Sequence, residues 1–256
     1  RAAAAPGDLQ PVARPLARLE RPGENAGPLT RRELLAHEPR LGRVVGGALL
    51  PDDHSVDPRA VVAALRSRLG GLVRATASPA VAGVTVVATG TTLPAAYACL
   101  VRPVRGEILR LQVTAGGLPE RTVRAWVHGE QVYVVPRASG EVVVGATQEE
   151  HDEPPIATVG GVWRLLDAAR RLMPELDRAE LRDVTARDRP GTPDNLPLVG
   201  PAGEPGVVLA AGHFRHGVLL APLTARLVAD HLETGLVEPA LDPRRLTITG
   251  GNSWES

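Results

Sequence analysis

The sequence predicts two intertwined domains, one α/β and one α+β. Three observations lead to this fold class. Short, largely apolar runs at residues 84–88 and 207–211 are typical of buried parallel strands. Amphipathic stretches such as residues 218–234 indicate helices, and the alternating runs between residues 102 and 147 predict an antiparallel sheet. Because the apolar strands lie on both sides of the antiparallel ones along the chain, each domain draws on more than one segment.

The first element with clear boundaries is a short helix. Thr30 and Glu33 have the spacing of a capping box, which satisfies exposed N–H groups at a helix start. The helix is expected to end before Pro39, because a residue that precedes proline disfavours helical geometry. A strand is predicted at residues 44–50.

A second helix begins at Asp57-Pro58, where an N-cap side chain precedes proline in the first helical position. Gly70-Gly71 ends it. Four of its apolar residues share one helical face: Val61, Val62, Leu65 and Leu69. The run at 84–88 follows as a strand.

The middle of the chain predicts an antiparallel meander. Gly129-Glu130 is a suitable two-residue hairpin turn, with glycine in the first position. The expected strands are 102–113, 123–128, 131–136 and 141–147.

The last third alternates between helices and strands. Residues 159–173 form an amphipathic helix with its buried side at Val162, Leu165, Leu166 and Met173. A strand at 181–188, the apolar strand at 207–211 and a closing helix at 218–234 complete the prediction.

Composition excludes several classes of protein. The 29 basic and 29 acidic residues cancel, so no electrostatic footprint for nucleic acid or an anionic membrane is present. Cys99 is the only cysteine, which excludes a disulfide framework. No apolar run reaches the ~18–20 residues of a membrane span, and no signal peptide is evident, so a cytoplasmic location is expected. The only methionine is Met173, so we expect a processed or partial chain.

Two arginines near the C-terminal end suggest a binding site. Arg189 precedes Pro190, which pushes its backbone toward extended geometry. Arg215 lies in the glycine-bracketed loop 212–217, directly before a helix whose first N–H groups have no intrahelical acceptor. Two guanidinium groups beside such a loop suit a small carboxylate next to an electron-accepting ligand. Taken singly, an arginine such as Arg189 is usually a surface salt-bridge former, and Arg215 is more often a solvated loop charge. Tyr133 on an alternating strand is by default a packing residue.

The histidines of this loop do not predict a metal centre. His213 and His216 are three residues apart without a nearby carboxylate, which is weak as a ligand pattern. No metal is therefore predicted.

Seven segments between about residues 8 and 235 form a recognisable series. In order they are LTRRELLAHEPRL, LLPDDHSVDPRAVVAAL, VVATG, RPVRGEILRL, QVYVVPRASGEVVVGATQEE, RDRPGTPDNLPLVG and GHFRHGVLLAPLTARLVADHL. Together they resemble the FAD-dependent D-amino-acid oxidase superfamily, and within it the glycine oxidases of thiamine biosynthesis. The last two motifs are the specific ones.

The resemblance implies roles for individual residues. Arg189 matches the arginine that clamps the substrate carboxylate, Tyr133 a tyrosine of the substrate pocket, and Arg215 a second arginine near substrate and flavin. A loop that wraps the flavin pyrimidine edge matches His213, Phe214, Arg215, His216, Gly217, Val218 and Leu219. No catalytic base is implied, because the flavin supplies the redox chemistry.

The implied reaction is the oxidation of glycine, or of another small amine or D-amino acid, to the imine. FAD is the cofactor, and O2 is reduced to hydrogen peroxide. A relative that oxidises sarcosine or a larger D-amino acid is the alternative within the family. The implied partners are the amino acid and O2, with no nucleic acid and no membrane, and a homo-oligomer is compatible with the sequence.

The chain departs from the family pattern at its beginning. Family members start with a strand, a GxGxxG loop and a helix that bind the FAD pyrophosphate, and no GxGxxG occurs in these 256 residues. The N-terminal dinucleotide-binding unit is therefore expected to be missing, and the region 72–84 is shorter than usual. The alternative function is a truncated, non-catalytic fragment that does not bind FAD.

The expected domains follow from this comparison. An incomplete FAD-binding domain with a parallel sheet comprises residues 56–99 and 198–235. A substrate domain with an antiparallel sheet comprises 29–55 and 100–197. Weakly ordered ends are expected at 1–28 and 236–256.

Overall fold

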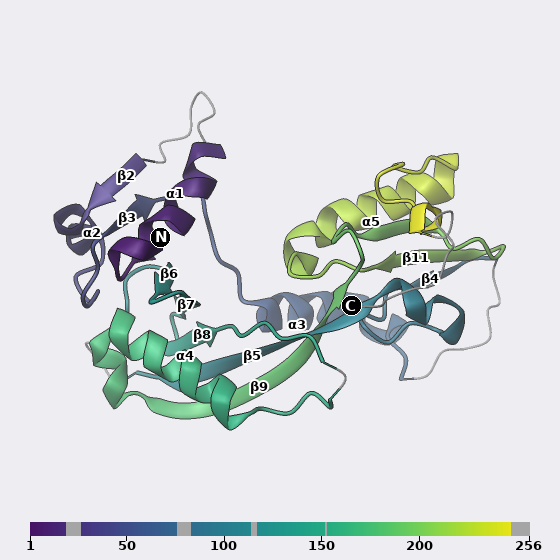
Figure 1. Cartoon of the computed structure of the whole chain (residues 1–256). Helices are drawn as coiled ribbons and strands as arrows, with labels where there is room; N and C mark the ends of the chain where they lie inside the picture. The colour runs from purple at the N-terminus through teal and green to yellow at the C-terminus, as the bar shows by residue number, and fades with distance from the viewer. Residues whose placement is uncertain (19–26, 76–82, 114–116, 152, 247–256) are drawn as a thin grey trace. The chain divides into compact units, whose positions relative to one another are not determined.

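The computed structural model describes residues 1–18, 27–75, 83–113, 117–151 and 153–246 (Figure 1). The chain divides into two compact units. Unit 1 comprises residues 1–56, 105–149 and 154–187, and unit 2 comprises residues 57–104, 150–153 and 188–256. The predicted fold class, mixed parallel and antiparallel sheets with helices, is confirmed. The assignment of one domain to FAD and one to substrate stays a prediction.

The larger sheet has eight strands in the order β2-β3-β1-β6-β7-β8-β5-β9. Its central meander is antiparallel throughout, as predicted, with β6 paired to β7, β7 to β8 and β8 to β5. The strands are β1 (Ala2–Ala3), β2 (Gly27–Thr30), β3 (Gly46–Leu49), β5 (Arg102–Gln112), β6 (Val123–Val127), β7 (Glu130–Pro136), β8 (Glu141–Gly145) and β9 (Glu180–Gly191).

The first residues belong to this sheet, although a weakly ordered end was expected there. Ala2 and Ala3 are almost fully buried, at 1% and 0% exposed. Strand β1 runs antiparallel to β3 and parallel to β6, so both of its edges are paired. The partners lie far along the chain, at residues 46–47 and 125–126, and local sequence carries no sign of such pairing.

The hairpin turn between β6 and β7 lies one residue before its predicted position. Val127 pairs with Glu130, which leaves His128 and Gly129 as the two turn residues. Both have positive φ, 53° and 87°, the geometry of a type I′ turn. Glycine therefore occupies the second turn position rather than the first.

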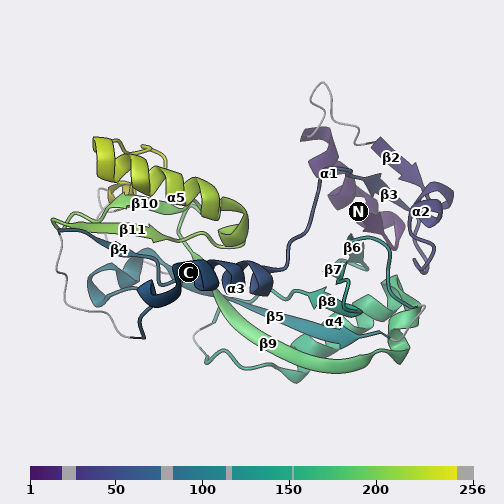
Figure 2. The same ribbon diagram turned by 180° about the vertical axis from the view of Figure 1, so that it is seen from behind.

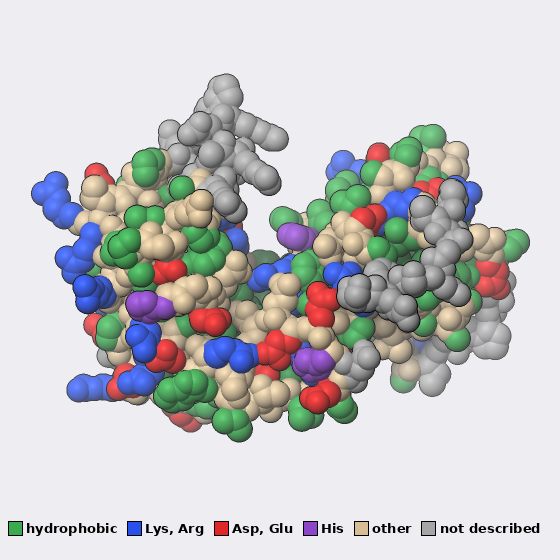
Figure 3. All heavy atoms as spheres, in the orientation of Figure 1, with side chains coloured by type: hydrophobic (Ala, Val, Ile, Leu, Met, Phe, Trp, Pro, Cys, Tyr) green, Lys and Arg blue, Asp and Glu red, His purple; other side chains and the backbone are tan. Residues whose placement is uncertain are grey.

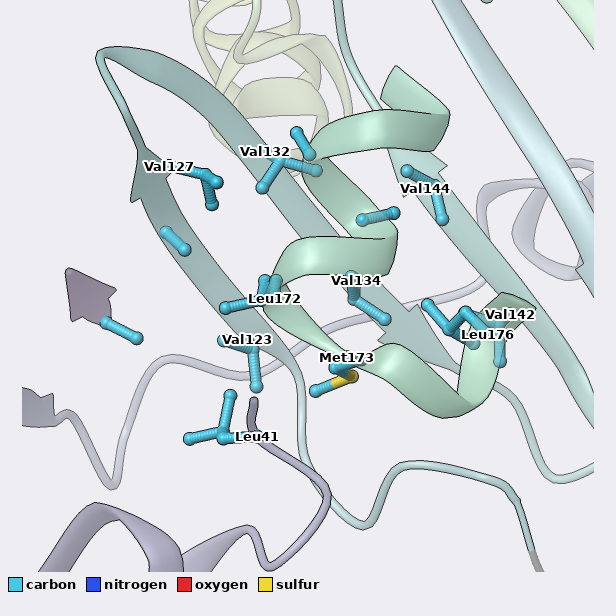
Figure 4. Packing of buried hydrophobic residues seen from close by; sticks show 14 of the residues in the cluster. Leu41, Val123, Val127, Val132, Val134, Val142, Val144, Leu172, Met173 and Leu176 are labelled. Carbon is cyan, nitrogen blue, oxygen red and sulfur yellow. The ribbon is translucent and has the colours of Figure 1, made fainter. Parts of the chain in front are cut away.

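Three helices accompany the larger sheet: α1 (Leu9–Arg18), α2 (Arg31–His37) and α4 (Val159–Leu172). The predicted capping box of α2 is present, since the Glu33 N–H donates to Thr30 Oγ1. Helix α4 buries Leu165 and Met173 follows it into the core, while Val162 and Leu166 are only half-buried. Figure 4 shows Leu172 and Met173 among valines of β6, β7 and β8.

A buried carboxylate marks the start of α4. Glu107 of β5 is 0% exposed, and its Oε1 accepts hydrogen bonds from the Thr158 N–H at 3.1 Å and from Thr158 Oγ1 at 2.7 Å. Thr158 in turn caps the helix by accepting from the Gly161 N–H at 3.0 Å. A Cβ built on Gly161 would overlap the Glu107 carboxylate. The sheet and the helix therefore approach closely because position 161 is glycine.

Unit 2 contains a three-stranded sheet in the order β10-β11-β4. Strands β10 (Leu198–Pro201) and β11 (Val207–Ala211) form an antiparallel hairpin, and β4 (Thr85–Val87) lies parallel to β11, as the apolar runs predicted. The short strand β10 was not expected from the sequence. Helix α5 (Gly217–Thr234) packs along β10 and β11 (Figure 2).

Parts of unit 2 are more exposed than their sequence suggests. In helix α3 (Pro58–Leu69), which begins and ends as predicted, no residue is buried. Val84, which precedes β4, and Val86 are 47% and 42% exposed, and β4 is the edge strand of its sheet in the described residues. The run at 84–88, expected to be covered on both faces, buries only Val87 within β4.

Basic and acidic side chains are interspersed on the face seen in Figure 3, in keeping with the zero net charge. Within the described ranges, the helices are too short or too polar to cross a membrane.

The contact between Gly161 and Glu107 predicts a position-specific loss of stability. Gly161→Ala should lower the free energy of unfolding by about 1–3 kcal/mol, because the new methyl group displaces a buried, hydrogen-bonded carboxylate. The neighbouring Gly160→Ala is the control: a Cβ there meets only Arg164 Nη1, at 3.7 Å. It should leave stability unchanged or raise it by up to about 1 kcal/mol. Denaturant unfolding measures both, and equal effects would contradict the prediction.

Candidate functional site

Arg189 lies at the end of strand β9, in the extended geometry that Pro190 predicted. Its side chain is half-buried. Gly191, two residues further along, lies against β5, where an added Cβ would be 3.1 Å from Val104 Cγ2. The strand end that carries Arg189 is therefore held closely against its neighbour.

The loop that contains Arg215 begins directly after strand β11. Gly212 has φ +71° and Phe214 has φ +47°, so this short turn contains two left-handed residues, one of which is not glycine. The Phe214 N–H donates a hydrogen bond of 2.9 Å to the Pro190 carbonyl. This bond ties the loop to the residue that follows Arg189, so the structure brings two separately predicted parts of the site together.

Helix α5 starts immediately after the loop. The Leu220 N–H donates to the His216 carbonyl at 2.8 Å, and the His216 side chain makes no capping hydrogen bond. Helix geometry gives the N–H groups of Gly217, Val218 and Leu219 no intrahelical acceptor. This end also carries the positive pole of the helix dipole. Val218 and Leu219 are 51% and 75% exposed, so apolar side chains surround an electropositive helix end.

His213 is fixed to the helix that follows. Its Nε2 lies 2.8 Å from Thr224 Oγ1, in hydrogen-bond contact. Burial lowers the pKa of His213 below its ordinary value, because the charged imidazolium is poorly solvated there. The neutral ring is therefore favoured near neutral pH, and it anchors the loop without adding charge.

Residues 192–196 form a second turn, which the sequence analysis did not assign to the site. Thr192 is fully buried, and its Oγ1 donates to the Leu196 carbonyl at 2.8 Å. Asp194 accepts from the Leu196 N–H at 3.0 Å and from two guanidinium nitrogens of Arg245, at 2.8 and 3.0 Å. Arg245 belongs to the 3₁₀ helix Pro243–Leu246. The letters TPDN indicate a turn, but nothing local indicates Arg245 as its partner.

Tyr133 lies in strand β7 of unit 1, whereas both arginines belong to unit 2. Its cross-strand partner in β8 is Gly145. A Cβ on Gly145 would overlap the tyrosine ring, so the glycine leaves the space that the half-buried ring occupies. The tyrosine is thus well fixed on its own sheet.

The remaining predicted residues, Arg215 and His216, are exposed beside the start of α5. Among the described residues, no three His, Cys, Asp or Glu side chains come together in a way that could hold a metal ion.

Comparison with known proteins identifies the family. The sequence profile of the FAD dependent oxidoreductase family matches residues 2–231. The chain belongs to this family. The resemblance drawn from the motifs is thereby confirmed.

Two sequence relatives cover most of the chain. The Bifunctional protein ThiO/ThiG of Synechocystis sp. is 34% identical over 251 residues, which span 88% of this chain and 38% of that protein. A glycine oxidase of Geobacillus kaustophilus is 32% identical over 256 residues, which span 89% of this chain and 66% of that enzyme. The chain thus spans less than two thirds of the length of either relative. The description of the family gives FAD as the group on which its members depend.

Solved structures agree with the sequence relatives. The crystal structure of the Geobacillus kaustophilus glycine oxidase superposes with a TM-score of 0.79 and 28% identity, covering 98% of this chain and 74% of that one. The iminodiacetate oxidase of Chelativorans sp. has a TM-score of 0.78 at 18% identity, which supports the shared fold alone.

The residues present suit one end of FAD. The uncapped start of α5 offers N–H donors and a positive pole, and Val218 and Leu219 offer exposed apolar surface to a planar ring. The pyrophosphate end is different, because the GxGxxG loop that binds it elsewhere does not occur in these 256 residues. The residues present therefore suit the flavin ring of FAD rather than its pyrophosphate.

The ion pair of the second turn predicts a pH-dependent contribution to stability. The hydrogen bonds from Arg245, with help from the Leu196 N–H, lower the pKa of Asp194 from 3.8 to about 2. The folded state thus favours the carboxylate, and the stabilisation is present above about pH 4 and is lost as the pH falls through about 2. Thermal unfolding should show Asp194→Asn less stable than wild type at pH 7, with the difference vanishing near pH 2.

The control for this experiment is Asp167→Asn, which removes an exposed pair with Arg171 on α4. It should cost no more than about 0.5 kcal/mol at any pH. A gap between wild type and Asp194→Asn that stays constant down to pH 2 would contradict the assignment.

Proposed function

We propose that this chain forms the substrate-facing and flavin-facing part of an FAD-dependent oxidase that converts glycine, or another small amine or D-amino acid, to its imine. The supporting observation is the hydrogen bond between the Phe214 N–H and the Pro190 carbonyl. It places the strand end that carries Arg189 beside the loop that suits the flavin ring. The relatives named glycine oxidase support the choice of a small amino acid.

Arg189 would bind the substrate carboxylate. A guanidinium group can donate two parallel hydrogen bonds to a carboxylate, which fixes the orientation of the substrate as well as its position. The half-buried side chain on a closely packed strand end supports this role, because a fork held by its strand loses little freedom on binding. An oriented carboxylate in turn orients the α-carbon.

The loop from His213 to Leu219 would hold the flavin ring. Bound FAD supplies the two-electron acceptor to which the α-carbon gives up its hydrogen. The exposed N–H groups at the start of α5 favour negative charge on the ring edge that they face, in the same way that preorganised donors stabilise an oxyanion. Val218 and Leu219 would cover apolar ring surface and exclude water.

Tyr133 and Arg215 complete the proposed set. Tyr133 would present its hydroxyl group from a fixed position on strand β7, and Arg215 would add a second positive charge beside the loop. No side chain is assigned as a base in this scheme: the substrate would lose its ammonium proton to solvent, and its α-hydrogen would leave as hydride. The balanced products are the imine and, from O2, hydrogen peroxide.

The second candidate function is a non-catalytic fragment that binds no FAD. The observation that favours it is the lack of a GxGxxG loop in the sequence, together with the exposed helix α3 and edge strand β4. Flavin binding separates the two candidates.

Purified protein incubated with FAD and passed through a desalting column should retain the flavin, seen as visible absorbance that stays with the protein. Free riboflavin is the matched probe, because it offers the same ring without the pyrophosphate. Retention of both supports binding through the ring, and retention of FAD alone supports an additional phosphate contact. A colourless protein in both cases would favour the non-catalytic fragment.

Arg189→Ala should raise the KM for glycine by about 10–100-fold, the cost of losing a hydrogen bond to a charged group. Flavin absorbance should not change. Arg189→Lys, which keeps the charge but not the fork, should give a smaller rise.

Arg182→Gln provides the control, because Arg182 lies on the same strand but is paired with Glu180 and exposed. Its KM should equal that of the wild type. Peroxide release measured against glycine concentration gives these values, and an unchanged KM in Arg189→Ala would remove Arg189 from the substrate site.

A further inference from the structure

The turn 192–196 and the loop 212–216 lie against each other at one end of the β10–β11 hairpin. Leu198, which follows the turn, pairs with Ala211, which precedes the loop. A Cβ built on Gly212 would be 2.6 Å from Thr192 Cγ2, so the Thr192 side chain lies against the Gly212 backbone in space that a glycine leaves. A displacement of Thr192 would therefore also displace the loop at Gly212.

The turn is held by a contact from the far end of the chain. Arg245 Nε donates to Asp194 Oδ2 at 2.8 Å, and Nη2 donates to Oδ1 at 3.0 Å and to the Leu196 carbonyl at 2.9 Å. Two parallel bonds to one carboxylate fix direction as well as distance. The Arg245 side chain is 16% exposed and that of Asp194 34%, so the arginine is the more enclosed partner while the carboxylate stays in contact with solvent.

The loop needs such support. Phe214 has φ +47°, a conformation that costs a non-glycine residue on the order of 1 kcal/mol and persists only where the surroundings enforce it. Two contacts enforce it here, the hydrogen bond to the Pro190 carbonyl and the contact of Gly212 with Thr192. Thr192 is the first residue of the turn that Arg245 holds, and Pro190 lies two residues before it.

We propose that Asp194 and Arg245 form a positioning pair that holds the 192–196 turn in place, and thereby keeps Arg189 and the 213–219 loop in a fixed relation. The pair touches neither the proposed substrate nor the flavin ring, so its effect is transmitted through Thr192, Pro190 and Phe214. A role of this pair in substrate binding rests on the function proposed above. The coupling between the 192–196 turn and the 213–219 loop does not.

Amide hydrogen exchange of the purified chain, without any ligand, tests the coupling. In Asp194→Asn the exchange of the Phe214 amide, in a peptide covering 212–216, should accelerate about tenfold or more, because its hydrogen bond to Pro190 opens more often. The amide of Leu196 should accelerate as well. Arg245→Gln should reproduce both effects, and Arg245→Lys, which keeps the charge without the fork, should be intermediate.

Arg244→Gln is the matched control. Arg244 is the neighbour of Arg245 and makes a similar two-nitrogen contact, but with Asp242 rather than with the turn. Exchange at 212–216 should not change in this variant. Unchanged exchange in peptides from the second half of α5, which belongs to the same unit, would show that this unit is folded in each variant.

Acceleration confined to residues 193–197 would overturn the proposal, because the pair would then stabilise only its own turn. In protein that binds flavin, Asp194→Asn should also raise the KM for glycine several-fold with little change in kcat. If the wild-type chain retains no flavin, the proposed function fails but the exchange experiment still decides the coupling.

Discussion

One backbone hydrogen bond, from the Phe214 N–H to the Pro190 carbonyl, joins the two segments on which the candidate site depends. Proline has no N–H, so its carbonyl is the only backbone hydrogen-bonding group at that position. The Pro190 carbonyl thus holds the loop in which Phe214 has a left-handed backbone conformation that would otherwise relax. In the proposed site, Arg189 would bind the substrate and the start of α5 would face the cofactor. The two groups can act together only if the distance between them is fixed. The short distance between the two backbones limits that variation.

Much of the fold could be predicted because its signals are local. The capping box at Thr30 and the N-cap at Asp57 mark helix starts, and alternation between residues 102 and 147 marks the meander. One error, the hairpin turn displaced by one residue at His128 and Gly129, is local. The other errors concern features that depend on distant partners. Strand β1 is two alanines, recognisable only through pairing with β3 and β6. The exposure of β4 depends on which elements cover its sheet, which its own residues do not encode.

The residues of the candidate site also fall into two groups, those with a local sequence signal and those without one. Arg189 and the loop after β11 carry strong motifs, and the structure links them within one unit. Thr192, Asp194 and Arg245 were missed, because the partner of the turn lies in a short 3₁₀ helix far along the chain. A single sequence contains no sign of that contact, although the composition of the turn itself was visible. The roles of Arg189, Arg215 and Tyr133 stay predictions.

The parallel pairing of β4 with β11 has a consequence for folding. It pairs Val86 with Val208, which lie far apart in the sequence. The entropy cost of bringing the two segments together must therefore be met before their pairing stabilises the fold. The β10–β11 hairpin, in contrast, closes a loop of only a few residues. The turns at the end of this hairpin therefore need not wait for the slow, entropically costly step. The segment that carries the most specific family motifs therefore contains a hairpin that can close locally.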